Sequence, residues 1–170
     1  MPTLYLFVGY PGSGKTTVAQ IICAATGAVH IWADRERQEM FGQPSHSASE
    51  SHQLYQYLND KTSHLLQEGK SVVFDTNFNF YKDREHLRQI AHQAGADVKL
   101  IWMKTEKELA KHRAVNDSHD KPTRLFGNMN ETAFDRIAGH LEEPKIAEEP
   151  IVLIGENLQK SAVLSALNLA

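Results

Sequence analysis

Cysteine is nearly absent from this chain of 170 residues, which contains a single one, Cys23. A disulfide framework within the chain is therefore excluded, and so is a zinc site built on several cysteines. The sequence also lacks a run of about 18 apolar residues, and its N-terminal residues show no basic segment leading into an apolar one. These absences predict a cytoplasmic protein without a membrane segment.

An excess of positive charge is lacking as well. Lysine and arginine number 18 against 21 aspartates and glutamates, which gives a formal net charge of -3. Without an overall cationic field, any contact with nucleic acid would have to be local. Repeats, low-complexity tracts and linkers are not evident, and a chain of this length can bury one two-sided core. We predict a single domain over residues 1–170.

The most informative segment reads GYPGSGKT over residues 9–16 and fits the pattern G-x-x-x-x-G-K-[ST]. Glycines in such a loop leave backbone N–H groups free to surround a polyphosphate, and the following helix points its positive end at it. Lys15 would reach the β- and γ-phosphate oxygens, and the Thr16 hydroxyl would bind Mg²⁺. The predicted ATP-binding residues here are Gly9, Tyr10, Pro11, Gly12, Ser13, Gly14, Lys15, Thr16 and Thr17.

Short apolar runs alternate with helical patterns along the chain. The runs predict five strands, at 4–8, 29–32, 72–74, 98–103 and 151–154. Capping boxes at Ser47-x-x-Glu50 and Thr105-x-x-Glu108 each predict the start of a helix. Repeated β–α units favour a parallel sheet covered on both faces, with ligands at the carboxyl ends of the strands. The predicted fold class is the α/β three-layer sandwich of P-loop NTPases, with a five-stranded parallel sheet.

Three polar segments interrupt this regularity. Residues 41–48 (FGQPSHSA) predict a turn-rich connection, and residues 142–149 (EEPKIAEE) predict a solvated turn. The third segment, residues 116–130 (NDSHDKPTRLFGNMN), has the length and polarity of a lid that closes over a ligand. We expect the lid region to span about residues 113–130.

A carboxylate and an arginine follow the second predicted strand. Asp34 stands at the strand tip, and Arg37 would share its face of a helix starting there. We predict that Asp34 is a general base for an acceptor hydroxyl and that Arg37 grips an anionic group of the acceptor. A helix-capping aspartate among solvated charges is the alternative.

The third predicted strand leads into a carboxylate, Asp75, followed by Thr76 and Asn77. A carboxylate at this position beside a phosphate loop can hold Mg²⁺ or its waters. Thr76 and Asn77 would orient the acceptor or the carboxylates, although both residue types are also common in turns.

Cationic side chains are needed to neutralise charge when a phosphoryl group moves. Arg113 is the first candidate, because it ends a helix that leads into the predicted lid. Arg124, within the lid, is the second candidate, and solvated surface arginines are the alternative. The nine histidines show no zinc-binding spacing, so we expect most of them to lie at the surface or in packing.

Together these elements resemble the kinase domain of polynucleotide 5′-hydroxyl kinases, in a wider group with zeta toxins and chloramphenicol phosphotransferase. The resemblance rests on GYPGSGKT, Asp34-x-x-Arg37, Asp75-Thr76-Asn77 and residues 109–113, and it covers about residues 3–145. It implies that Asp34 activates the acceptor hydroxyl, that Arg37 binds an acceptor phosphate, and that Asp75 supports that site. It further implies ATP and Mg²⁺ at Lys15 and Thr16, and Arg113 as the lid arginine. The second lid arginine of the family has no adjacent counterpart here, since residues 114–117 read AVND.

The sequence thus predicts an ATP- and Mg²⁺-dependent kinase that moves the γ-phosphoryl of ATP to a hydroxyl by in-line attack. The resemblance favours a nucleic-acid or nucleotide 5′-hydroxyl as the acceptor. Two alternatives stay open. One is a small-molecule kinase of the same fold, which the acidic net charge favours. The other is a non-catalytic ATP- or GTP-binding module, although an N-K-x-D motif for guanine is missing.

Overall fold

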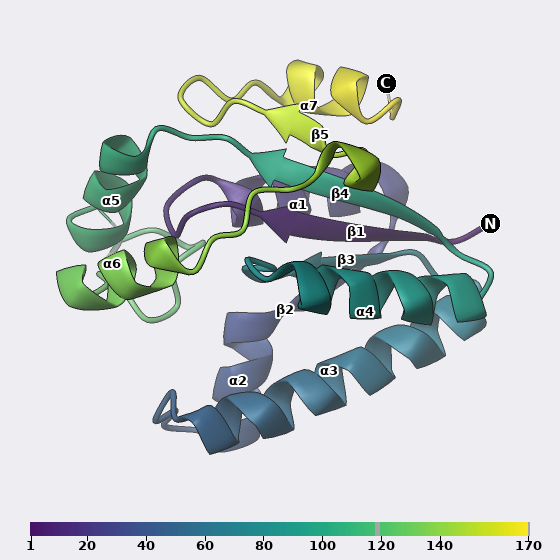
Figure 1. The fold of residues 1–170 in the computed structure, drawn as a ribbon, viewed down its shortest axis with the longest axis horizontal. Coiled ribbons are helices and arrows are strands. Elements are labelled where there is room, and N and C mark those ends of the chain that lie inside the picture. The colour runs from purple at the N-terminus through teal and green to yellow at the C-terminus, as the bar shows by residue number, and fades with distance from the viewer. Residues whose placement is uncertain (118–119, 170) are drawn as a thin grey trace.

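The structure, a computed structural model, describes residues 1–117 and 120–169 (Figure 1). Five strands form one sheet in the order β2-β3-β1-β4-β5, and every pair of neighbours is parallel. This confirms the predicted fold class. The strands are β1 (Thr3–Val8), β2 (Val29–Trp32), β3 (Val72–Asp75), β4 (Asp97–Met103) and β5 (Ile151–Leu153).

Helices connect the strands, and α5 and α6 lie side by side beyond the arrowheads of the strands, where ligands bind in such sheets (Figure 1). Among the described residues, no helix is long and apolar enough to cross a membrane. The helices are α1 (Lys15–Thr26), α2 (Ala33–Phe41), α3 (Ala48–Gln67), α4 (Tyr81–Gln93), α5 (Lys107–Val115), α6 (Glu131–Gly139) and α7 (Lys160–Ala166), with a 3₁₀ turn η1 (Ile146–Glu148).

Only one of the two predicted N-terminal caps is present in the structure. The Ser47 hydroxyl does accept from the Glu50 N–H and caps α3, as expected. The prediction for Thr105 is wrong, because Glu106 caps α5 by accepting from the Leu109 N–H. The Thr105 hydroxyl instead donates to the carbonyl of Ser13, so it ties the end of β4 to the phosphate loop.

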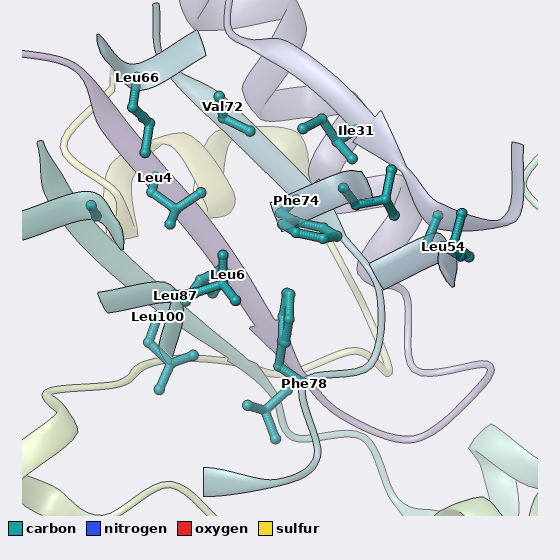
Figure 2. Packing of buried hydrophobic residues seen from close by; sticks show 14 residues of the cluster. Leu4, Leu6, Ile31, Leu54, Leu66, Val72, Phe74, Phe78, Leu87 and Leu100 are labelled. Atoms are coloured by element: carbon teal, nitrogen blue, oxygen red, sulfur yellow. The ribbon is translucent and has the colours of Figure 1, made fainter. Parts of the chain in front are cut away.

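Alternating side chains of the central strand divide the core into two layers. Leu4, Leu6 and Val8 face α3 and α4, whereas Tyr5 and Phe7 face α1 and α7. Figure 2 shows the first layer, in which fully buried leucines of α3 and α4 pack on strand residues. Burial on both faces explains why the strands read as short continuous apolar runs. The loops at the carboxyl edge are thereby mounted on a rigid sheet.

A buried ion pair fixes the connection between α6 and β5 to α4. The Arg84 guanidinium, which has no exposed surface, donates to both carboxylate oxygens of Glu148 at 2.7 and 2.9 Å. It also donates to the carbonyls of Phe78 and Asn79, just beyond β3. The expectation that residues 142–149 are a solvated turn is therefore wrong at Glu148. Sequence alone gave no sign that a partner 64 positions away would bury this carboxylate.

The pKa of Glu148 reflects this pairing. Burial by itself would raise the pKa, but hydrogen bonds from Arg84, the Lys145 N–H and Arg88 lower it from 4.5 to about 2. Because the folded-state pKa is depressed, the pairing stabilises the protein fully above the unfolded-state pKa. That contribution is lost as the pH falls from about 4.5 through about 2.

We expect Arg84→Met to lower the free energy of unfolding by about 3–5 kcal/mol, because it leaves the Glu148 carboxylate buried without its main partner. Urea denaturation at pH 7 measures this. Adding Glu148→Leu should restore part of the loss, since an apolar pair needs no charge compensation. An Arg84→Met variant as stable as the wild type, with an unchanged decline of stability below pH 4.5, would contradict the assignment.

Candidate functional site

The phosphate loop between β1 and α1 is closed around the side chain of Lys15. Its ammonium donates to the carbonyls of Gly9 at 2.9 Å and Tyr10 at 2.6 Å. Gly12 and Gly14 have φ values of 81° and 104°, a region that L side chains rarely adopt. A Cβ on Gly12 would also collide with the Ala110 carbonyl of α5. The loop therefore needs glycine at these positions.

Two cations meet at this loop. Burial and the nearby Arg124 guanidinium lower the pKa of Lys15 to about 7, and the Asp75 and Asp34 carboxylates offset part of this effect. Arg124 itself is desolvated, and burial lowers its pKa while Asp34 and Asp75 raise it. A polyphosphate bound here would neutralise both cations, which is the electrostatic property expected of a nucleotide site.

Asp75 is the last residue of β3 and pairs in register with Trp32 of β2. Its side chain is 3% exposed, and its Oδ2 lies 3.1 Å from Nε2 of His30. Among the described residues, no group of three or more His, Cys, Asp or Glu side chains could hold a metal ion by itself. Asp75 and Thr16 line the same cavity, and Mg²⁺ commonly binds through one carboxylate, waters and nucleotide phosphates. The residues present fit that mode of binding.

Asp34 lies in the first turn of α2 and opens into the same cavity. It does not cap the helix, since no side-chain hydrogen bond is made at this helix start. Desolvation and the Asp75 carboxylate raise the pKa of Asp34, and Arg124, Arg37 and His46 offset part of that rise. A carboxylate with a raised pKa is a better proton acceptor, so its environment suits a general base.

Arg37 has a different environment from the one that the sequence suggested. Its side chain is buried and donates to the Glu50 carboxylate at 2.6 Å and to the Ser51 hydroxyl at 3.2 Å. Although burial would raise it, hydrogen bonds from Arg37 and from Ser45 and His46 lower the pKa of Glu50 to about 2. Arg37 still lines the cavity. An acceptor anion would have to share this guanidinium with Glu50.

Thr76 and Asn77 also reach the cavity. The Thr76 hydroxyl lies 2.7 Å from the Tyr55 hydroxyl of α3. The Oδ1 atom of Asn77 is buried and has no hydrogen-bond partner among the residues that the structure describes. A buried acceptor atom without a partner is costly, so it favours a ligand that donates a hydrogen bond there.

The two candidate arginines occupy different places. Arg113 donates to the carbonyls of Gly155 at 2.9 Å and Glu156 at 3.5 Å, in the connection between β5 and α7. Arg124 instead lies close enough to Lys15 and Asp34 to lower the pKa of each, and the Asp34 and Asp75 carboxylates in turn raise the pKa of Arg124. Both line the cavity. Two residues of the predicted lid, Ser118 and His119, lie outside the described residues.

Sequence reasoning missed several residues that line this cavity of about 760 Å³. They come from elements whose approach no local pattern reveals. One of them, His46, belongs to a residue type that we expected to lie mostly at the surface or in packing. The missed lining residues include Trp32, His46, Tyr55 and Arg136, whereas Phe126 belongs to the lid region that the sequence predicted.

His46 combines an unusual backbone with a contact to another residue that lines the cavity. Its φ is 55°, in the left-handed region, and its N–H donates to the Glu50 carboxylate at 3.1 Å. The imidazole meets the ring of Phe126, in the predicted lid region, edge-on, with centroids 5.0 Å apart and planes at 87°. Strained residues of this kind persist where the surrounding structure enforces them, often at functional sites.

We expect His46→Gly to be more stable than His46→Ala by about 0.5–1 kcal/mol, because glycine adopts a positive φ without a Cβ penalty. Both variants lose the contact with Phe126, so the comparison isolates the backbone. Urea unfolding of the two variants measures the difference. An alanine variant at least as stable as the glycine variant would show that this backbone is unstrained.

Comparisons with known proteins agree with this architecture. A family model described as an AAA domain matches residues 4–144. No curated protein matches the sequence. The matched segment includes the phosphate loop, Asp34, Asp75 and the whole predicted lid region.

Solved structures of several kinases share the fold. A sugar kinase from Janibacter sp. HTCC2649 is 18% identical, with a TM-score of 0.71 over 100% of this chain and 96% of that one. The APS kinase of Mycobacterium tuberculosis, solved with AMPPNP and APS, is 18% identical, with a TM-score of 0.68 over 99% and 96%. A gluconokinase from Sinorhizobium meliloti 1021 is 16% identical, with a TM-score of 0.66 over 99% and 90%. At these identities the similarity establishes the common fold.

Proposed function

The chain belongs to the AAA domain family whose model matches residues 4–144, and we propose that it is an ATP-dependent kinase acting on a small hydroxyl compound. One observation carries the proposal. Two cations, Lys15 and Arg124, and two carboxylates, Asp34 and Asp75, interact electrostatically within one cavity. A phosphate site alone would need the cations, whereas a carboxylate with a raised pKa beside them suits proton removal from an acceptor.

In the proposed reaction, the phosphate loop and Lys15 hold the β- and γ-phosphates of ATP. The acceptor hydroxyl gives its proton to Asp34, and its oxygen attacks the γ-phosphorus. The bond from that phosphorus to the β–γ bridging oxygen breaks, and ADP leaves with the electron pair. Mg²⁺, when held by Thr16 and Asp75 with the phosphates, would neutralise charge on the transferred group. Arg124 would stabilise the charge that develops on the γ-phosphoryl oxygens.

The acceptor side of the cavity favours a small ligand that carries several hydroxyls. The unpartnered Oδ1 of Asn77 and the hydroxyl pair of Tyr55 and Thr76 offer hydrogen bonds to such a compound. His46 and Phe126 line the cavity from two separate loops and contact each other, which suits a compact ligand better than a strand of nucleic acid. Sugar kinase and gluconokinase structures of the same fold are consistent with this choice.

The nucleic-acid acceptor, expected from the resemblance, has less support. It depended on Arg37 binding an acceptor phosphate, and this guanidinium is already paired with Glu50 at 2.6 Å. The comparisons give no support to a polynucleotide kinase, since the solved structures reported above are a sugar kinase, an APS kinase and a gluconokinase. The net charge of -3 also supplies no broad basic surface.

Transfer of labelled γ-phosphate from ATP to a panel of acceptors tests the proposal. The panel contains sugars, sugar acids, nucleosides, adenylyl sulfate and 5′-hydroxyl oligonucleotides. We expect transfer to a small polyhydroxy compound, and Asp34→Asn should reduce its kcat by ~10²- to 10⁴-fold with little change in ATP affinity. Transfer to oligonucleotides alone would overturn the choice of acceptor. ATP binding without transfer to any member would favour the non-catalytic module instead.

The two arginines give a second prediction. Arg124→Ala should lower kcat by ~10²- to 10³-fold, as expected when one donor to the transition state is lost, and Arg124→Lys should recover only part of it. Arg113→Ala should affect kcat less and act mainly on the KM for ATP, because its partners lie in the connection between β5 and α7. Steady-state kinetics of the three variants decide this, and a larger kcat effect at Arg113 than at Arg124 would reverse the assignment.

A further inference from the structure

We propose that His30 is a positioning residue for the Mg²⁺ of the nucleotide complex, because it holds the Asp75 carboxylate in a fixed orientation. This inference rests on the proposed ATP site and concerns a residue outside the phosphate loop and the lid. His30 donates from Nε2 to Oδ2 of Asp75 across 3.1 Å. Among the described residues, His30 is the only side chain that donates a hydrogen bond to Asp75, so Oδ1 can accept another ligand.

The sheet register explains why these two side chains meet. Trp32 pairs with Asp75, and His30 pairs with Val73, so all four residues project from the same face of neighbouring parallel strands. This is the face that α1 covers, and α1 begins at the phosphate loop. His30 therefore contacts Asp75 from the neighbouring strand β2. Thr16 and Asp75 both line the cavity.

An aromatic stack restricts the imidazole. The rings of His30 and Trp32 are nearly parallel, at 4° with centroids 6.0 Å apart. Trp32 is 4% exposed, and the Arg35 guanidinium lies 4.9 Å from the centroid of its ring. Packing against a buried indole limits rotation of the imidazole, so its Nε2 stays directed at the carboxylate. Because a carboxylate oxygen only accepts, the hydrogen bond requires a proton on Nε2.

Hydrogen bonds to a metal-binding carboxylate set which oxygen it presents, and losing such a partner commonly weakens metal affinity by ~10- to 100-fold. With Oδ2 engaged by His30, Asp75 would present Oδ1 to Mg²⁺ or to one of its waters. His30 would thereby make Asp75 a single-oxygen ligand, which suits the octahedral preference of Mg²⁺. A purely structural histidine would stabilise the strand pair without affecting metal affinity.

Calorimetric titration of Mg²⁺ into the complex with AMPPNP tests this role. We expect His30→Phe, which retains a ring but lacks the donor, to weaken Mg²⁺ affinity by ~10- to 100-fold. Affinity for AMPPNP in EDTA should stay at the wild-type value. His30→Gln, whose amide can still donate to Asp75, should recover part of the loss. Should His30→Phe fail to fold, His30→Val offers a strand-forming residue without a donor.

Two controls separate this role from a structural one. In an Asp75→Asn background, His30→Phe should cause little further loss, because the carboxylate that it positions is gone. His86→Phe, at an exposed position of α4, should leave both affinities unchanged. Equal weakening of AMPPNP with Mg²⁺ and in EDTA, or a lower melting temperature alone, would overturn the inference. A wild-type protein whose AMPPNP binding ignores Mg²⁺ would overturn the proposed metal site itself, whereas a magnesium-dependent wild type with an unaffected His30→Phe would overturn His30 alone.

Discussion

The buried ammonium of Lys15 is the group on which the rest of the site depends. The backbone carbonyls of Gly9 and Tyr10 hold it, and the loop can close around it because glycines at positions 12 and 14 adopt positive φ values. Burial beside a second cation lowers its pKa to about 7, so the site as it stands is short of negative charge. Asp34 and Asp75 supply part of that charge. A bound polyphosphate would supply the rest of the negative charge and would stabilise the desolvated guanidinium of Arg124.

Two glutamates with depressed pKa values hold the surroundings of the site in place. Glu50 gathers Arg37 and the backbone of residues 45 and 46, and so shapes the loop that carries His46. Glu148 gathers Arg84 and Arg88, and Arg84 in turn binds the carbonyls that follow β3. Each carboxylate thus holds a polar connection between secondary-structure elements in a fixed position. The proposed acceptor side is therefore preorganised by ion pairs, whereas the proposed phosphate side is preorganised by backbone geometry.

Local patterns in the sequence were enough to predict the five strands, the parallel sheet and the phosphate loop, because each depends on residues close together in the chain. The same patterns placed Asp34 and Asp75 at the carboxyl edge. They could not give Arg37 its partner 13 residues away or Glu148 its partner 64 residues away. Thr105 was misread because its hydroxyl bonds the distant Ser13 instead of its own helix. His30 escaped notice because its role comes from the pairing of β2 with β3.

In the proposed site, the residues that would bind phosphate and the residues that would select the acceptor belong to different kinds of elements. Lys15, Asp75 and Asp34 are attached to strands or to the first turns of the helices that follow them, so the rigid sheet sets their positions. His46, Phe126 and Asn77 lie in connecting loops, and the contact between His46 and Phe126 joins two loops that share no strand. Loops on a rigid scaffold can change without disturbing the scaffold itself. A change of acceptor would therefore need substitutions at loop residues such as His46, Asn77 and Phe126, while the phosphate loop, Arg124 and both carboxylates stay as they are.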